Sequence, residues 1–320
     1  QDKTAFEKML EIKGDSDHTK LIDMLTDLND YSIGIEDVLK EHFDEENIVY
    51  WMAFQILMGN VDTQNRNVYL YSPLNSDIWY FIAWDNDGCL MRPEYELRNF
   101  SDQNSWEKGI SNYWGNILFQ RCLKSRSFRE KLNDAILDLR EYLNKDMLTS
   151  KIESYKNVLK PYLYLMPDAE YEPLTSEQYD QIAASLPDEI EKNYQLYLES
   201  LETPMPFYIG VPTIDGDKLK FNWDVSYDLD AEDITYSVEV AGDYLFRDVI
   251  YQNTTLTVPE AEMDLPKAGQ YFVRVRATNT SGKTQDAFDY YVTDEGKYYG
   301  MRCFYITEDS TVEEDDYEEG

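Results

Sequence analysis

The chain has 320 residues, with 63 Asp and Glu against 29 Lys and Arg, so its formal net charge is −34. That charge repels nucleic-acid phosphates and anionic lipid, which disfavours nucleic-acid and membrane-surface partners, and no apolar run approaches the roughly 18 residues of a membrane span. Three cysteines and two histidines give no disulfide framework, no His-based triad and no zinc motif.

Helices are predicted for the first part of the chain. Residues 1–43 are predicted to form polar amphipathic helices, because apolar side chains recur at helical steps. An apolar cluster in the first of them consists of Phe6, Met9 and Leu10. Residues 45–57 carry a denser apolar pattern that predicts a helix buried on most sides, and Gly59 is expected to end it.

A β-hairpin is predicted next. Residues 68–71 and 78–84 are rich in β-branched and aromatic side chains, and residues 72–77 between them have turn chemistry. The second strand leads into the segment Asp85-Asn86-Asp87-Gly88. The hairpin therefore presents two acidic residues at its end.

Helical periodicity returns between Trp114 and Leu201, with a break near Ser125. A Pro-bearing stretch at residues 203–206 is interpreted as a domain linker. Beyond it, apolar side chains alternate at period two, which predicts a β-sandwich. The acidic run that begins at Glu313 is expected to be a disordered tail or a linker.

The candidate site is built on the loop before the hairpin and on the turn after it. Asp62 precedes Asn67 in the loop, and Asp85 ends the hairpin. Protein kinases use this order of residues: one Asp accepts or orients the proton of the attacking hydroxyl, while an Asn and a second Asp hold Mg²⁺ ions that shield the nucleotide phosphates. Asp87 is interpreted as a further metal ligand, with a turn role before Gly88 as the alternative.

Other interpretations of these residues stay open. Asn, Asp and Gly are also the ordinary residues of turns and helix caps. A carboxylate-based hydrolase that uses Asp62 and Asp85 is a further hypothesis, although no paired acid and base with a substrate-cleft pattern surrounds them. Arg66 is interpreted as an exposed structural arginine, with a phosphate contact as the alternative.

Several segments resemble the signature of the CotH kinase family. They are residues 59–63, with the sequence Gly-Asn-Val-Asp-Thr, residues 67–71, with Asn-Val-Tyr-Leu-Tyr, and residues 81–88, which contain Trp-Asp-Asn-Asp-Gly. The helical stretches 121–129 and 151–168 resemble the same family, so the resemblance covers about Glu45 to Leu201.

Members of that family are atypical kinases that phosphorylate spore-coat or secreted proteins. The resemblance implies that Asp62 takes the catalytic-base position and that Asn67 and Asp85 are metal ligands supported by Asp87. It further implies Mg²⁺, or Mn²⁺ or Ca²⁺, as the cofactor, with ATP in the complete protein. It also implies a secreted or cell-surface protein substrate and an extracellular or cell-surface location.

The sequence departs from complete kinases in two ways. Asn60-Val61 replaces the usual His-Arg before the catalytic Asp, and no strand-rich lobe with a Gly-rich loop and a phosphate-binding Lys precedes Glu45. Because this lobe is absent from the pattern, we expect an excised or cleaved C-terminal piece of a larger protein or a degenerate homologue, and the opening at Gln1 favours a processed form or an excised piece. In either case the chain is not expected to turn over ATP alone. The rival function is a non-catalytic extracellular or cell-surface scaffold or adhesion module.

The C-terminal part resembles a fibronectin type III domain. Leu219, Phe221 and Trp223 fit a core strand, and Tyr271 fits the corner tyrosine, whose hydroxyl bonds back to the backbone. Exposed aromatic side chains are interpreted as a candidate surface for a protein or sugar partner of this sandwich, with ordinary edge-strand tyrosines as the alternative. The candidates are Tyr290, Tyr291, Tyr298 and Tyr299.

The predicted fold class is therefore α+β. A mostly helical, kinase-like C-lobe carries the catalytic-loop β-hairpin, and an all-β fibronectin-III or immunoglobulin-like sandwich follows it. The predicted parts are a CotH kinase-like catalytic-lobe region at 1–203 without its N-lobe, the sandwich at 204–294, and a final strand with an acidic tail at 295–320.

Overall fold

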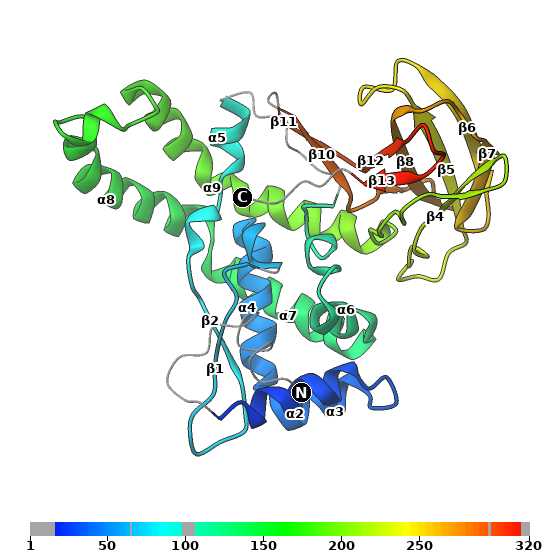
Figure 1. Cartoon of the computed structure of the whole chain (residues 1–320). Coiled ribbons are helices and arrows are strands. Elements are labelled where there is room, and N and C mark those ends of the chain that lie inside the picture. The colour runs from blue at the N-terminus through cyan, green and yellow to red at the C-terminus, as the bar shows by residue number, and fades with distance from the viewer. Residues whose placement is uncertain (1–16, 65, 98–105, 294–295, 315–320) are drawn as a thin grey trace.

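The computed structural model describes residues 17–64, 66–97, 106–293 and 296–314 (Figure 1). Helices and antiparallel sheets are both present, which confirms the α+β prediction. The helices are α2 (Thr19–Asn29), α3 (Ile35–His42), α4 (Glu45–Met58), α5 (Arg92–Leu97), α6 (Ile117–Lys124), α7 (Arg126–Tyr142), α8 (Lys145–Leu163) and α9 (Ser176–Glu202). None of the helices in these ranges is long and apolar enough to cross a membrane. The predicted cluster of Phe6, Met9 and Leu10 lies outside the described residues.

Helix α4 lies at the centre of the helical part and packs against α7, α9 and the hairpin (Figure 1). The Asp44 carboxylate caps its N-terminus by accepting a hydrogen bond from the Asn47 N–H at 2.9 Å. Gly59 ends it in the left-handed conformation, with φ at 61°, where a residue without a side chain is favoured. The predicted buried helix and its C-cap are confirmed.

The hairpin consists of β1 (Tyr69–Tyr71) and β2 (Tyr80–Ile82), paired antiparallel as predicted. Helix α4 holds β2 in place through the Asn47 side-chain amide. Its oxygen accepts from the Phe81 N–H at 2.7 Å, and its nitrogen donates to the Phe81 carbonyl at 3.1 Å. The buried Phe81 ring also packs on Trp51 of α4, with ring centroids 4.7 Å apart. The hairpin is thus fixed to a helix that is buried along most of its length.

Of the later helices, α7 and α9 pack against α4, while α6 packs on α7 and α8 packs on α9. Helices α6 and α7 are separated at Ser125, near the predicted break, and the Ser125 hydroxyl caps α7 by accepting from the Phe128 N–H. Helices α8 and α9 pack against each other and extend away from the hairpin (Figure 1). Helix α9 then runs back across the helical part to the β-sandwich (Figure 1).

The C-terminal part contains two antiparallel sheets. One has the order β13-β12-β8-β5-β6 with β9 beside β8, and the other has the order β3-β4-β7. Their strands are β3 (Thr213–Asp215), β4 (Lys218–Asn222), β5 (Ile234–Ala241), β6 (Val249–Leu256), β7 (Glu260–Asp264), β8 (Gly269–Asn279), β9 (Thr284–Asp286), β12 (Met301–Ile306) and β13 (Val312–Glu314). Trp223 and Tyr236 are buried in their shared core. The Tyr271 hydroxyl donates to the Lys267 carbonyl at 2.9 Å, as predicted for a corner tyrosine.

Two expectations for the C-terminal part were wrong. The four tyrosines expected to be exposed are half-buried in a separate hairpin, β10 (Tyr290–Thr293) and β11 (Gly296–Tyr299). Their rings contact other aromatic side chains, because the hairpin packs against the sandwich and the helical part. Glu313 and Glu314 were expected in a disordered run, but they pair with β12 in strand β13.

The stretch interpreted as a linker is buried. Helix α9 ends at Glu202, whose carbonyl accepts a hydrogen bond from the Asn279 side chain of the sandwich at 3.0 Å. Residues 203–207 are buried, and the Met205 N–H donates to the Tyr227 carbonyl at 2.7 Å. The division at residues 203 and 294 stays a prediction.

Replacing Tyr271 with Phe tests the sandwich corner. The substitution removes the hydroxyl that donates to the Lys267 carbonyl and changes nothing else in the ring. We expect the free energy of unfolding to fall by about 1 kcal/mol, the usual net contribution of one such hydrogen bond. Urea unfolding followed by tryptophan fluorescence measures it. Tyr155→Phe on the exposed face of α8 is the control, and equal losses in both variants would contradict the prediction.

Candidate active site

Asp62 lies in the first turn after α4, where the chain leaves the helix for the hairpin. It opens a short 3₁₀ turn, Asp62–Gln64, and its backbone N–H donates to the Asn60 side-chain oxygen at 3.3 Å. The neighbouring Thr63 is buried, and its hydroxyl bonds the Asn60 carbonyl at 3.3 Å and the Tyr113 hydroxyl at 3.1 Å. Buried contacts of Asn60, Thr63 and Tyr113 therefore fix the backbone around Asp62, while the Asp62 carboxylate is exposed.

The turn after the hairpin approaches Asp62 closely. Asp85 has φ at 49°, in the left-handed region, and a 3₁₀ turn from Asn86 to Gly88 follows it. A side chain at Gly88 would place its Cβ 2.9 Å from the Asn60 side-chain oxygen and 3.2 Å from a carboxylate oxygen of Asp62. Because only a residue without a side chain allows this approach, Gly88 brings the turn and Asp62 together.

Three side-chain amides join the two loops beneath these carboxylates. Gln55 of α4 is fully buried and accepts from the Asn60 amide at 3.0 Å. It also donates to the Asn86 side-chain oxygen at 3.0 Å, which the Asn60 amide reaches at 3.3 Å. Asn86 stands between Asp85 and Asp87, so this network fixes the turn that carries both acids.

The three acidic residues interact electrostatically. The charge of Asp87 is the largest cause of a raised pKa at Asp85, followed by partial desolvation, a hydrogen bond with Asp87 and the charge of Asp62. All three carboxylates are exposed. The structure therefore brings together Asp62, Asp85 and Asp87. A cation bound among them would reduce the repulsion between their negative charges.

Asn67 is placed at the hairpin entrance, with φ at 53°. The register of the hairpin pairs Tyr69 with Ile82, so its continuation sets Asn67 opposite Trp84, the residue before Asp85. The Tyr69 and Trp84 rings stack at 5.4 Å, which shows that the strands stay adjacent there. The backbone of Asn67 thus lies beside the acidic turn. The role of Asn67 as a metal ligand stays a prediction.

The donor set fits a hard divalent cation. Carboxylate and amide oxygens are the ligands that Mg²⁺ uses, and Mg²⁺ is commonly held by one or two carboxylates together with waters and substrate phosphates. The residues that the structure describes contain no group of three or more His, Cys, Asp or Glu side chains arranged to hold a metal on their own. A pair such as Asp85 and Asp87 therefore suits a metal that is shared with phosphate oxygens.

Cys89 borders the site without suiting nucleophilic catalysis. Burial raises the pKa of its thiol to about 12, although a hydrogen bond with Asn60 acts in the opposite direction. A thiol with that pKa stays protonated near neutral pH and is a weak nucleophile.

The comparison with protein families decides the relationship. The model of the family described as CotH kinase protein matches residues 1–197. The chain belongs to the CotH kinase family. No curated protein sequence matches it.

Two solved structures show only weak similarity to this CotH family member. The twitchin kinase region from C. elegans has a TM-score of 0.23 and 15% identity, covering 30% of this chain and 20% of that one. Domains 1–6 of the surface layer protein SbsC have a TM-score of 0.17 and 11% identity, covering 96% of this chain and 40% of that one. The chain thus spans less than half the length of either structure.

Sequence reasoning missed the residues that hold the candidate site together. The sequence pattern places Gln55 inside the apolar run of residues 45–57 and Asn86 inside the segment that follows the hairpin, and it assigns neither a role in the site. A signal for Gln55 was present, because an amide inside a helix predicted to be buried on most sides needs polar partners. Nothing in the sequence near Asn86 identifies Gln55 as its partner.

Replacing Asp85 with Asn tests the repulsion without metal. The variant removes one of three interacting charges, so with a chelator present at pH 7 we expect Tm to rise by about 1 °C. Because the pKa of Asp85 is raised in the folded protein, the wild type gains stability as the pH falls through that raised pKa toward the ordinary value of 3.8. The Tm difference between the proteins should shrink over the same range. Differential scanning calorimetry from pH 7 to 4 measures it, and a constant difference would contradict the assignment.

Proposed function

We propose that this kinase-like chain carries the phosphoryl-transfer residues of an atypical protein kinase, which moves phosphate from ATP to a hydroxyl of a secreted or cell-surface protein. The observation that carries the proposal is the contact of the Gly88 turn with Asp62. It sets one carboxylate beside two others that repel each other. Membership of the CotH kinase family supports the same reaction class.

Asp62 is proposed to act on the attacking hydroxyl. Its carboxylate is exposed at the end of a rigidly held loop, where a substrate hydroxyl can reach it. In the transfer, the hydroxyl oxygen forms the new bond to the γ-phosphorus while the bond to the β,γ-bridging oxygen breaks, and ADP leaves. Asp62 accepts the hydroxyl proton.

Asp85, Asp87 and Asn67 are proposed to hold the divalent metal. A bound Mg²⁺ or Mn²⁺ supplies positive charge that neutralises the phosphate oxygens. The left-handed conformation of Asp85 turns the chain sharply between the hairpin and Asn86, and the buried amides hold that conformation. Backbone conformations of this kind cluster at ligand-binding sites, where the surrounding structure maintains them.

A hydrolase is less well supported by the arrangement. Hydrolysis by two carboxylates requires one of them to act as an acid, in an environment that keeps it protonated near neutral pH. Asp62, Asp85 and Asp87 are all exposed. The extracellular or cell-surface location and the protein substrate belong to this proposal through the family alone.

Metal binding is the first test. We expect Mg²⁺ or Mn²⁺ at millimolar concentration to raise the Tm of the wild-type chain, because a cation that binds the folded site stabilises it. Asp85→Asn should lose most of that shift. Asp77→Asn is the matched control, since Asp77 is an exposed acid at the opposite end of the same hairpin. An equal metal response in Asp85→Asn and the wild type would contradict the assigned ligands.

Phosphate transfer is the second test. It uses the protein expressed with any sequence that precedes Gln1 in its gene, incubated with γ-labelled ATP and Mn²⁺. We expect label on protein, and Asp62→Asn should reduce the rate by about 100-fold or more, as for loss of a general base. Metal binding without any transfer would favour the alternative, a non-catalytic surface scaffold that retains a kinase-like lobe.

A further inference from the structure

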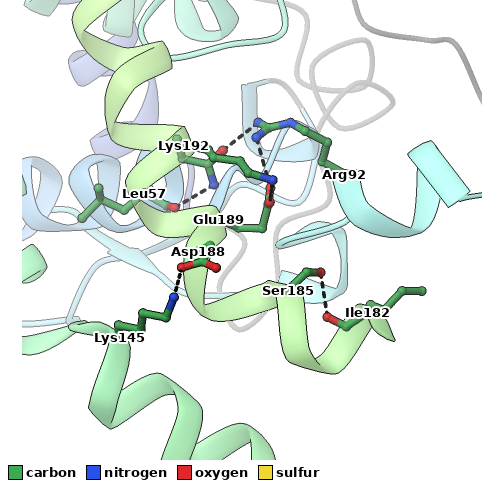
Figure 2. Close-up of polar contacts among 9 residues, drawn as sticks. Leu57, Arg92, Lys145, Ile182, Ser185, Asp188, Glu189 and Lys192 are labelled. Atoms are coloured by element: carbon green, nitrogen blue, oxygen red, sulfur yellow. Dashed lines mark hydrogen bonds and ion pairs between the residues drawn. The ribbon is translucent and has the colours of Figure 1, made fainter. Parts of the chain in front are cut away.

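Helix α9 contributes a buried carboxylate that the proposed reaction does not use. Glu189 is 1% exposed, and its two oxygens have different partners. One pairs with the Arg92 guanidinium at 3.1 Å, and the other with Lys192 at 2.6 Å (Figure 2). A buried carboxylate without a cation would be strongly unfavourable, so these contacts hold Arg92 at a defined place.

Arg92 opens helix α5, just beyond the acidic turn. Its guanidinium makes a second contact, donating to the Asn193 side-chain oxygen at 2.7 Å. Figure 2 shows the Arg92 side chain extending from its own helix toward the helix that carries Glu189 and Lys192. Arg92 therefore ties the segment that follows Asp87 to α9 at two points.

Asn193 makes the corresponding link to the other loop. Its nitrogen donates to the Leu57 carbonyl at 2.9 Å, in the last turn of α4. A side chain at Gly59 would place its Cβ 2.7 Å from that nitrogen, so the exit of α4 lies directly against Asn193. The chain from this exit leads straight to Asp62.

A backbone hydrogen bond closes the arrangement. The Leu90 N–H donates to the Met58 carbonyl at 2.8 Å, joining the segment after the acidic turn to the end of α4. In chain order, Met58 stands between Leu57 and Asp62, and Leu90 stands between Asp87 and Arg92. Helix α9 therefore contacts both loops, in addition to the links that Gln55 makes between them from α4.

We propose that Arg92, Glu189 and Asn193 form a clamp that sets the distance between Asp62 and the Asp85–Asp87 turn. They are positioning residues, because none of them is among the residues assigned to metal or substrate. The metal affinity of the site then depends on α9, a helix far away in sequence. The effect on metal affinity rests on the proposed metal site, whereas the clamp itself can be tested without metal.

The test uses Arg92→Lys in the intact chain. Lysine keeps the positive charge beside Glu189 but cannot contact Glu189 and Asn193 together in the fork that a guanidinium provides. The matched control is Lys145→Gln. It breaks the exposed ion pair between Lys145 of α8 and Asp188, the neighbour of Glu189 on α9, and leaves the clamp contacts intact (Figure 2). Circular dichroism establishes that both variants are folded at the temperature used.

Hydrogen exchange of the Leu90 amide is the metal-free readout. We expect its protection to fall about tenfold or more in Arg92→Lys, while core amides of α7 keep theirs, because only the local opening becomes easier. Lys145→Gln should leave Leu90 unchanged. Unchanged protection of Leu90 in Arg92→Lys overturns the clamp, and a uniform loss at every amide also overturns it, because the role of Arg92 would then be general stability.

Mn²⁺ affinity, measured by electron paramagnetic resonance of the free ion, is the second readout. We expect Arg92→Lys to weaken binding about tenfold, as for residues that orient metal ligands, and Lys145→Gln to bind as the wild type does. Equal affinity in all three proteins overturns the proposed effect on the metal. If the wild type binds no Mn²⁺, the metal assignment fails, and the link to metal fails with it. The Leu90 exchange result still decides whether the clamp exists.

Discussion

The side-chain amide of Gln55 is the contact on which the candidate site depends. It is fully buried on α4 and bonds both Asn60 and Asn86, one from each loop of the site. A buried amide left without partners would destabilise the fold, so the loops must return to it whenever the chain folds. Helix α4 thereby joins two loops whose acidic side chains are exposed, and the clamp from α9 acts on the same two loops.

The hydrogen bonds of Gln55 hold the two loops together against the repulsion between Asp62, Asp85 and Asp87. Asp85 adopts a left-handed backbone conformation and carries a raised pKa because of Asp87 and Asp62. Neither feature stabilises the free protein, and both persist because the amide network and the close approach at Gly88 leave the turn no alternative. A site that keeps its charges together before a cation arrives has less rearrangement to make when one binds, which is the advantage of preorganisation.

The parts of the fold that follow local patterns could be predicted from the sequence. The hairpin, the buried helix ending at Gly59 and the corner Tyr271 each follow from residue types close together in the chain. The clamp could not be predicted, because Arg92 and Glu189 meet only after α9 folds back across α4. The tyrosines of β10 and β11 were misjudged for the same reason, since the surfaces that cover them come from distant segments.

Helix α9 connects the clamp to the sandwich. Its last carbonyl, at Glu202, accepts from Asn279 of the sandwich, and Ser200 accepts from the Ile110 N–H of the helical part. Near this end, Trp106 packs edge-on against Phe288, with ring centroids 5.2 Å apart, so a residue of the C-terminal part joins the core of the helical part. Because α9 is held at this end by buried contacts, Glu189 and Asn193 are presented to the site from a fixed support. The sandwich therefore contributes to the geometry of the site through α9, although it supplies none of the assigned ligands.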